Sequence, residues 1–316
     1  MKKWIFYIFF FNCLSSTAQD TAESIVQEPL AIEENYFNKN RFKAVSAIHA
    51  ASYTATLLIL SQTWYKEHPR SSFQFFDDSK EWLQVDKVGH SWTTYNLAKY
   101  SKSLWIWSGV EDKKATWLGG ISGLGYQTIL EILDAHSAEW GWSWTDMAAN
   151  VAGAVLFTSQ EFAWQQQKIH LKFSTHRNNH PENLEERANT LFGKTLPERL
   201  LKDYNSQTYW LSFNLSSFIQ SDALPPWLNV AVGYGATGLY GGFENFAVDK
   251  TGTVIFDRRD IERLRQWYIS PDIDFTRIKT NSKGVRTALN IINMLKVPAP
   301  ALELTSGKFK FRWFYF

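Results

Sequence analysis

The sequence is almost devoid of cysteine: Cys13 is the single cysteine among 316 residues. It lies within residues 1–18, which have the basic start, short apolar stretch and small residues before a cut after Ala18 that characterise a secretory signal peptide. The mature chain then has no thiol, which excludes disulfides and cysteine chemistry in an oxidising envelope compartment. No small residues precede Cys13, so we expect no lipid anchor.

The sequence also lacks an excess of either charge. It has 33 basic and 31 acidic residues, and removal of Lys2 and Lys3 with the signal peptide takes the basic count to 31. A chain near neutrality without a basic run is not expected to bind nucleic acid. We expect an exported protein of the periplasm or outer membrane whose partner is an envelope lipid or envelope protein.

Motifs that identify common enzymes and cofactor sites are missing. The sequence has no Walker loop, no G-x-S-x-G and no H-E-x-x-H. Residues 233–238 fit the spacing G-x-G-x-x-G, but they lie in an alternating stretch without the strand–helix context that dinucleotide binding requires. Neither a cofactor nor an enzymatic activity is therefore assigned from motifs.

Aromatic residues are abundant, at 16% of the chain, with 15 tryptophans. Large rings either fill a protein core or lie at an interface such as the headgroup region of a membrane. The mean hydropathy of −0.29 is that of a soluble protein. Membrane association is thus one of two interpretations that the composition leaves open.

The hydrophobic pattern divides the mature chain into four parts. Residues 19–41 form a polar tail, 42–170 a helical domain, 171–195 a polar linker and 196–316 a β-rich region. Apolar residues at helical spacing predict helices at about 42–64, 86–108, 114–133 and 145–167. Small residues four apart, such as Gly119 and Gly123, predict close helix crossings.

Alternating residues predict strands in the last part, within 209–216, 228–240, 267–273 and 309–316, with one helix at about 283–295. The expected fold class is α+β: an N-terminal region like a four-helix bundle, followed by a small antiparallel β region with one helix. An aromatic terminal strand also suits an outer-membrane β-element, but Lys310 and Arg312 share the face of Phe316. We therefore favour a small sheet packed on the bundle.

The candidate site consists of ionisable and amide residues in apolar helices, where burial is costly unless they bond to one another or to a ligand. Asp86 and His90 are four residues apart on one helical face, as are Asp146 and Asn150. The expected ligand-binding set is Asp86, Lys87, His90, Gln127, Glu131, Asp134, Asp146 and Asn150.

Each member also has a structural interpretation. Asp86 fits a helix N-cap, and Ser143-x-x-Asp146 has the spacing of a capping box. The functional interpretation makes His90, Glu131 and Asp146 candidates for acid/base catalysis, and Asp86, His90 and Glu131 candidates for metal binding. Both interpretations stay open from the sequence.

The motif order resembles a known family. Asp86-Lys87-x-x-His90, Glu131 and Ser143-x-x-Asp146-x-x-x-Asn150 resemble the YfiM-like family of predicted periplasmic lipoproteins and, more distantly, the VanZ-like membrane proteins, over about residues 80–157. The resemblance implies an envelope protein and no particular reaction. VanZ-like proteins are associated with resistance to glycopeptide antibiotics.

Two functional hypotheses follow. In the first, the helical bundle binds an amphiphile or another envelope component through its polar cluster. In the second, the protein is a hydrolase or transferase, metal-assisted or acid/base, acting on an envelope lipid or a peptidoglycan-related substrate.

Overall fold

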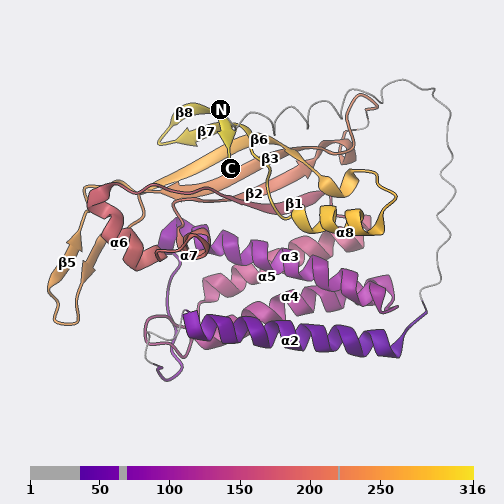
Figure 1. Ribbon diagram of the computed structural model, residues 1–316, viewed down its shortest axis with the longest axis horizontal. Coiled ribbons are helices and arrows are strands. Elements are labelled where there is room, and N and C mark those ends of the chain that lie inside the picture. Colours follow the sequence, from indigo (N-terminus) through magenta and orange to yellow (C-terminus); the bar gives the residue numbers. More distant parts are fainter. Residues whose placement is uncertain (1–35, 64–69, 220) are drawn as a thin grey trace, which may run out of the picture. The chain divides into compact units, whose positions relative to one another are not determined.

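Helices and an antiparallel sheet make up the part of the chain that the computed structural model describes, residues 36–63, 70–219 and 221–316 (Figure 1). The elements are α2 (Lys39–Thr63), α3 (Val85–Trp107), α4 (Asp112–Asp134), α5 (Trp144–Trp164), β1 (Ile169–Thr175), α6 (Glu182–Phe192), α7 (Leu196–Lys202), β2 (Gln207–Asn214), β3 (Leu228–Thr237), β4 (Phe246–Val248), β5 (Val254–Asp257), β6 (Leu264–Ile273), α8 (Lys283–Ile292), β7 (Ala299–Thr305) and β8 (Lys308–Tyr315). The expected α+β class is confirmed. The predicted signal peptide with Cys13, and the tail up to residue 35, lie outside the described residues.

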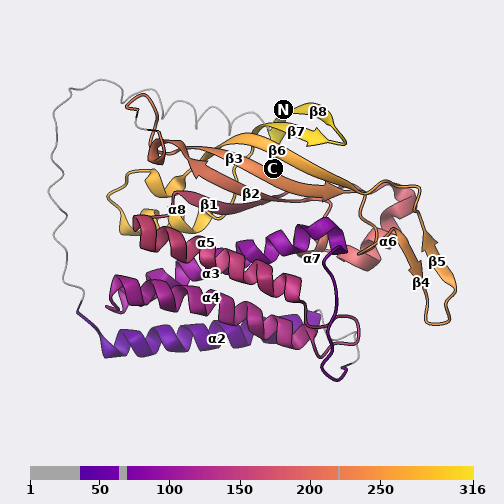
Figure 2. The ribbon, with the colours of Figure 1, turned by 180° about the vertical axis from the view of Figure 1, so that it is seen from behind.

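Helix α3 is the centre of the helical layer, with α4 and α5 packed along it (Figures 1 and 2). Glycines on α4 allow the backbones to approach closely. A Cβ atom at Gly119 would lie 2.6 Å from the carbonyl oxygen of Ala98, and one at Gly123 would lie 2.6 Å from that of Thr94. Gly153 on α5 faces the backbone of α3 in the same way. The close crossings predicted from small-residue spacing are confirmed.

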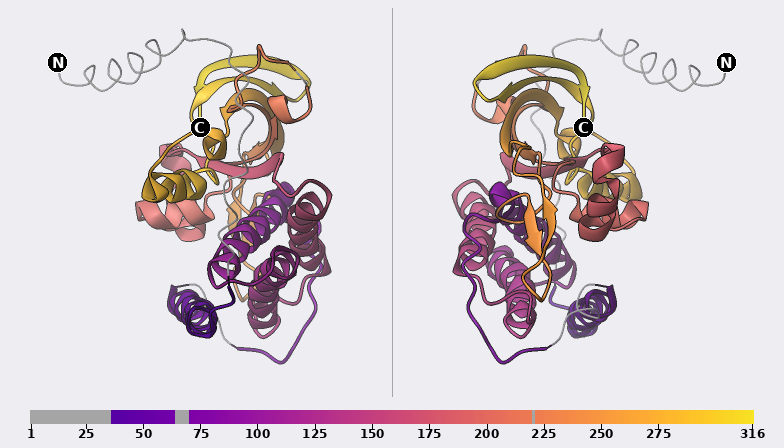
Figure 3. Two further views of the ribbon diagram at one scale, coloured as in Figure 1. Left: turned by 90° about the vertical axis from the view of Figure 1, so that its right-hand side faces the viewer. Right: turned by 90° about the vertical axis from the view of Figure 1, so that its left-hand side faces the viewer.

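The strands of the main sheet follow the order β1-β2-β3-β6-β7-β8, and every neighbouring pair is antiparallel. Seen end-on in Figure 3, the sheet curls away from the helices, with β1 and β2 nearest to α3. Tyr95 of α3, Phe157 of α5 and Leu171 of β1 form a buried cluster between the layers. This packing fixes the position of α3, and with it the candidate site.

Residues 171–195 are not the linker that the sequence suggested. They contain most of β1 and all of α6. The error has a physical cause, because polar residues of β1 are buried inside the curl of the sheet. Lys172 is fully buried with its Nζ atom 2.8 Å from Asp272, and the His170 Nε2 atom lies 3.0 Å from Asp274.

The β-rich region also holds more elements than expected. Strands β4, β5 and β7 and helix α7 add to the predicted strands and the single predicted helix, which is α8. Strands β4 and β5 form a separate two-stranded hairpin between β3 and β6. Within the described residues, no helix combines the length and the hydropathy needed to cross a bilayer.

Two glycines of α4 provide a matched test of the helix packing. Gly123→Ala should lower the free energy of unfolding by roughly 2 to 3 kcal/mol, because the new methyl group meets the backbone of α3. Gly125 has no atom within 4 Å of the corresponding position. Gly125→Ala should therefore raise stability by up to about 1 kcal/mol, the usual gain in helix propensity. Urea unfolding of both variants measures the difference, and equal effects would contradict the close crossing.

Candidate functional site

The ammonium group of Lys87 lies at the centre of a buried ionic cluster. Its Nζ atom is 2.5 Å from Asp78, 2.9 Å from Asp86 and 2.8 Å from Asp146. Burial alone would lower the pKa of Lys87, but the charges of Asp86 and Asp146 outweigh it and hold that pKa above its ordinary value. The ammonium of Lys87 is thus contacted by carboxyl groups from three segments of the chain: the connection before α3, α3 itself and the start of α5.

The residues just before α3 form a left-handed turn. Trp82, Leu83 and Gln84 have φ values of 46°, 50° and 66°, a conformation that costs energy for residues other than glycine. Gln84 is the N-cap residue of α3, so the structure does not use Asp86 as the cap. Asp86 instead contacts Lys87, and its burial raises the pKa of its carboxyl group. The strained turn therefore directs the first turn of α3 into the cluster.

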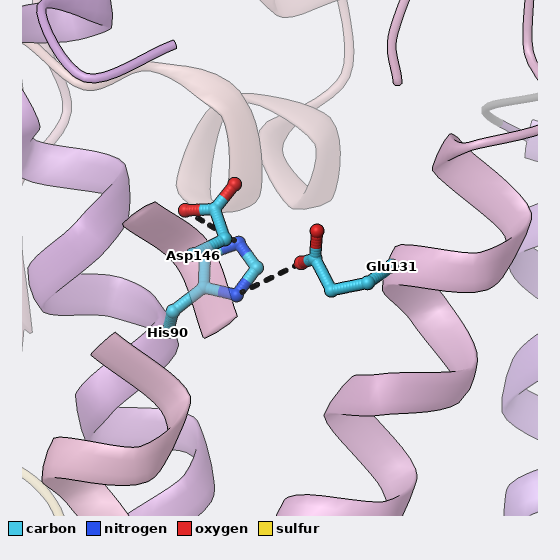
Figure 4. A group of neighbouring side chains, drawn as sticks. All are labelled: His90, Glu131 and Asp146. Carbon is cyan, nitrogen blue, oxygen red and sulfur yellow. Dashed lines mark ion pairs between the residues drawn. The ribbon is translucent and has the colours of Figure 1, made fainter. Parts of the chain in front are cut away.

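His90, one helical turn after Asp86, lies between two carboxyl groups (Figure 4). Its Nε2 atom is 3.6 Å from Asp146, and its Nδ1 atom is 3.6 Å from Glu131. The Nδ1 atom also lies 3.2 Å from the amide oxygen of Asn150, to which Gln127 donates a hydrogen bond at 3.2 Å. The predicted residues His90, Gln127, Glu131, Asp146 and Asn150 are thus brought together.

The start of α5 forms only half of the capping box that its sequence suggests. The hydroxyl of Ser143 accepts a hydrogen bond from the backbone N–H of Asp146 at 2.9 Å, as an N-cap does. The N–H of Ser143, however, points to Glu131 at 3.5 Å instead of to the side chain of Asp146. The carboxyl group of Asp146 is therefore turned toward Lys87 and His90.

Two of the carboxyl groups next to His90 have clearly different proton affinities. Burial, followed by the charges of Asp146 and Asp134, raises the pKa of Glu131 to about 9. Burial also raises the pKa of Asp146, to about 6, although the charge of His90 opposes the shift. At neutral pH Glu131 is then protonated while Asp146 is mostly ionised, a separation typical of groups with distinct acid and base roles.

A pocket of about 570 Å³ opens beside the cluster. One part of its wall is polar and consists of Asp78, Glu81, Asp86, His90, Gln127, Asp134 and Asp146. The rest is mainly aromatic and aliphatic, with Phe76, Trp82, Trp92, Tyr126, Leu130, Trp140, Phe173, Leu200, Leu201, Tyr204 and Tyr209. The predicted residue Asp134 is thus placed on the same pocket, at the end of α4. A small amphiphilic molecule matches this division of the wall.

Sequence reasoning missed Asp78 and Glu81. The hydroxyls of Ser143 and Thr145 donate to Asp78 at 2.5 and 2.6 Å. Burial would raise the pKa of Asp78, but these bonds together with those from Asp146 and Lys87 hold it below its ordinary value. Burial raises the pKa of Glu81 to about 7. Both residues lie before α3 in segments without helical or strand periodicity, so no spacing in the sequence marked them.

Comparison with known proteins supports the envelope assignment. Residues 74–159 match the model of a family described as "Predicted periplasmic lipoprotein (DUF2279)". No curated protein and no solved structure gave a significant match. The matched range contains the Lys87 cluster, His90, Glu131 and Asp146. The protein is exported and belongs to the periplasm or the outer membrane.

Glu131 provides a test of the site's electrostatics. Its pKa in the folded protein, about 9, lies above the ordinary value of 4.5, so the folded state binds more protons than the unfolded state between these pH values. Stability should therefore fall as pH rises through this window, by up to about 1.4 kcal/mol per pH unit from this group. Glu131→Gln keeps the shape without the ionisation, so it should flatten that slope and be more stable than the wild type at pH 8.

Chemical unfolding at several pH values between 5 and 9 measures the slope. The matched control is Glu186→Gln, which removes an exposed carboxyl group on α6 and should leave the curve as it is in the wild type. A Glu131→Gln variant with the unaltered slope would show that Glu131 is ionised in the folded protein.

Proposed function

We propose that this envelope protein binds an amphiphile in the pocket beside the Lys87 cluster. The observation that carries the proposal is the division of the pocket wall into two parts. The ionic part comes from α3, α4, α5 and the connection before α3, and the apolar part reaches to α7 and the sheet. Binding pockets for small molecules combine apolar walls with a few convergent polar groups in this way.

The charge of the cluster indicates the chemistry of the ligand's polar head. Asp78, Asp86 and Asp146 face a single ammonium, that of Lys87, and Glu81 lies on the same pocket. An anionic head would be repelled by this excess of carboxylates, whereas an amine or a hydroxyl-rich head would donate hydrogen bonds to them. The expected ligand is therefore an amphiphile with a cationic or sugar-like head.

Substitutions of two leucines of α7 distinguish binding in the pocket from adsorption to the protein surface. Leu200 lies on the pocket wall, whereas Leu196 begins the same helix, is exposed and does not line that pocket. Calorimetry with decylamine, decyl maltoside and decyl phosphate, in EDTA and below their micelle concentrations, should show saturable binding of the first two. Leu200→Gln should weaken that binding at least 5-fold, since about 1 kcal/mol of apolar contact is replaced by a buried amide.

Leu196→Gln is the control and should bind as the wild type does. Equal weakening by the two substitutions, or no saturable binding of any of the three compounds, would contradict the proposal. Preferential binding of decyl phosphate would contradict the inferred charge of the head.

A second candidate function is acid/base hydrolysis or group transfer on an envelope lipid or peptidoglycan-related substrate. It is favoured by the position of His90 between carboxyl groups with pKa values of about 6 and about 9. His90 would act as the base and Glu131 as the acid. The test is calorimetry on addition of an envelope lipid extract. Continuous heat release by the wild type that is absent in His90→Gln would favour this catalytic function over binding.

The finer relationship, to the YfiM-like and VanZ-like proteins, is part of this proposal. It is supported by the joint placement of Lys87, His90, Glu131, Asp146 and Asn150, the residues that carry the motif resemblance. The shared pattern then serves to assemble one polar cluster at the start of α3 and α5.

We also propose that the outer face of α4 and α5 rests on a lipid bilayer. No exposed residue of α4 from 117 to 133, or of α5 from 144 to 160, is charged. Aromatic pairs lie at the two ends of this face: Trp117 with Phe162, and Phe75 with Trp144. Such rings prefer the level of the lipid headgroups, so a bilayer surface suits the face better than water does.

Flotation with phosphatidylethanolamine/phosphatidylglycerol vesicles tests this association. Ile121→Glu combined with Val155→Glu should reduce the floated fraction severalfold, because two charges would enter the apolar face. Val254→Glu combined with Ile255→Glu is the matched control, since these exposed apolar residues lie on β5, outside that face. Flotation that the first pair leaves unchanged would show that the α4–α5 face does not contact lipid.

A further inference from the structure

The pocket's ionic wall contains more acid than base. Around His90 and Lys87 the structure gathers five carboxyl groups, those of Asp78, Glu81, Asp86, Glu131 and Asp146. Lys87 is the one lysine or arginine that forms an ion pair with members of this group, among the described residues. A buried excess of carboxyl groups is stabilised by protons or by a further cation.

One subset of these groups has the composition of a metal site. His90, Glu131 and Asp146 each offer one ligand atom, and these atoms all lie within 4.8 Å of one another. Ligands that share one ion at about 2.1 Å are about 3 to 4 Å apart, so small side-chain rotations complete the site. The three residues come from α3, α4 and α5, so the packed bundle holds them in place (Figure 4).

Two buried oxygen atoms in this cluster have no hydrogen-bond partner. The Glu131 side chain is 1% exposed, and its Oε1 atom, directed at His90, accepts no hydrogen bond. The Oε1 atom of Gln127 is also buried without a partner, while its Nε2 atom donates to Asn150. Buried oxygens without donors are rare in folded proteins, and a bound cation would satisfy them.

We propose that His90, Glu131 and Asp146 bind a divalent transition-metal ion next to the pocket, whose wall includes His90 and Asp146. Asn150 is the positioning residue: its amide oxygen lies 3.2 Å from the Nδ1 atom of His90 and also accepts hydrogen bonds from Gln127 and Thr94, which holds the imidazole in place between the two carboxyl groups. One imidazole with two carboxylates suits Zn²⁺ or Mn²⁺ better than Ca²⁺, which prefers oxygen ligands alone.

The neighbouring set of Asp78, Glu81 and Asp86 is the weaker choice, although its atoms are equally close together. The ammonium of Lys87 contacts Asp78 and Asp86 directly, and two hydroxyls donate to Asp78. A second cation there would have to displace Lys87. The set around His90 contacts Lys87 through Asp146 alone.

This inference goes beyond amphiphile binding and does not depend on it, so the two are tested apart. The full mature protein, stripped with EDTA and free of amphiphile, is titrated with ZnCl₂ and with MnCl₂, with CaCl₂ as the comparison. We expect one equivalent of Zn²⁺ or Mn²⁺ to bind and to raise the melting temperature. His90→Gln and Glu131→Gln should each weaken binding at least 10-fold.

Two further variants make the result specific. His136→Gln removes an exposed histidine just after α4 and should bind metal as the wild type does. Asp86→Asn removes a carboxylate of the other set and should leave the stoichiometry at one. The melting temperature of each variant in EDTA, measured alongside, separates loss of metal binding from loss of fold.

Failure of the wild type to take up one equivalent of either metal would overturn the proposal. Uptake that survives in both His90→Gln and Glu131→Gln, or that is lost in Asp86→Asn alone, would overturn it too. Decylamine binding in EDTA reports on the amphiphile pocket separately, so the failure of one proposal does not decide the other.

Discussion

The attraction between Lys87 and three carboxylates is the interaction on which the site depends. Asp78, Asp86 and Asp146 come from three segments, and in a poorly solvated space they would repel one another by several kcal/mol without a cation between them. The ammonium therefore fixes the entry of α3 relative to the start of α5. That geometry in turn sets where His90, one turn further along α3, meets Glu131.

The stability of the surrounding bundle allows this arrangement. A protonated Glu131 inside α4 and a left-handed turn at Trp82–Gln84 both oppose folding. The close contacts of Gly119, Gly123 and Gly153 with the backbone of α3, and the aromatic packing between helices and sheet, act in the opposite direction. Local features that cost stability while the rest of the fold is well packed are typical of functional sites.

Much of the fold and of the candidate site could be predicted from the sequence, and the features that were missed have clear physical causes. Glu131 stood out because a carboxyl group in an apolar helical pattern needs a partner, and the glycine spacing on α4 anticipated its crossing with α3. Asp78 gave no signal, since it lies in an irregular connection where no period relates it to α3. Strand β1 was missed because His170 and Lys172 are polar yet buried, whereas polarity in a sequence is normally read as exposure.

The contrast between the two buried ionic groups argues that the pocket cluster is more than structural. In the sheet, cations match or outnumber carboxylates: Lys172 and Lys296 lie at 2.8 and 4.0 Å from Asp272, and His170 pairs with Asp274. The charges of this group compensate one another, although the Oδ1 atom of Asp272 accepts no hydrogen bond. At the pocket the balance is reversed, with carboxyl groups in excess and the Oε1 atom of Glu131 left without a donor. This difference in charge balance, beside an open pocket, is the physical ground for both binding proposals, because carboxyl groups in excess gain from a cation or a hydrogen-bond donor that the chain itself does not supply.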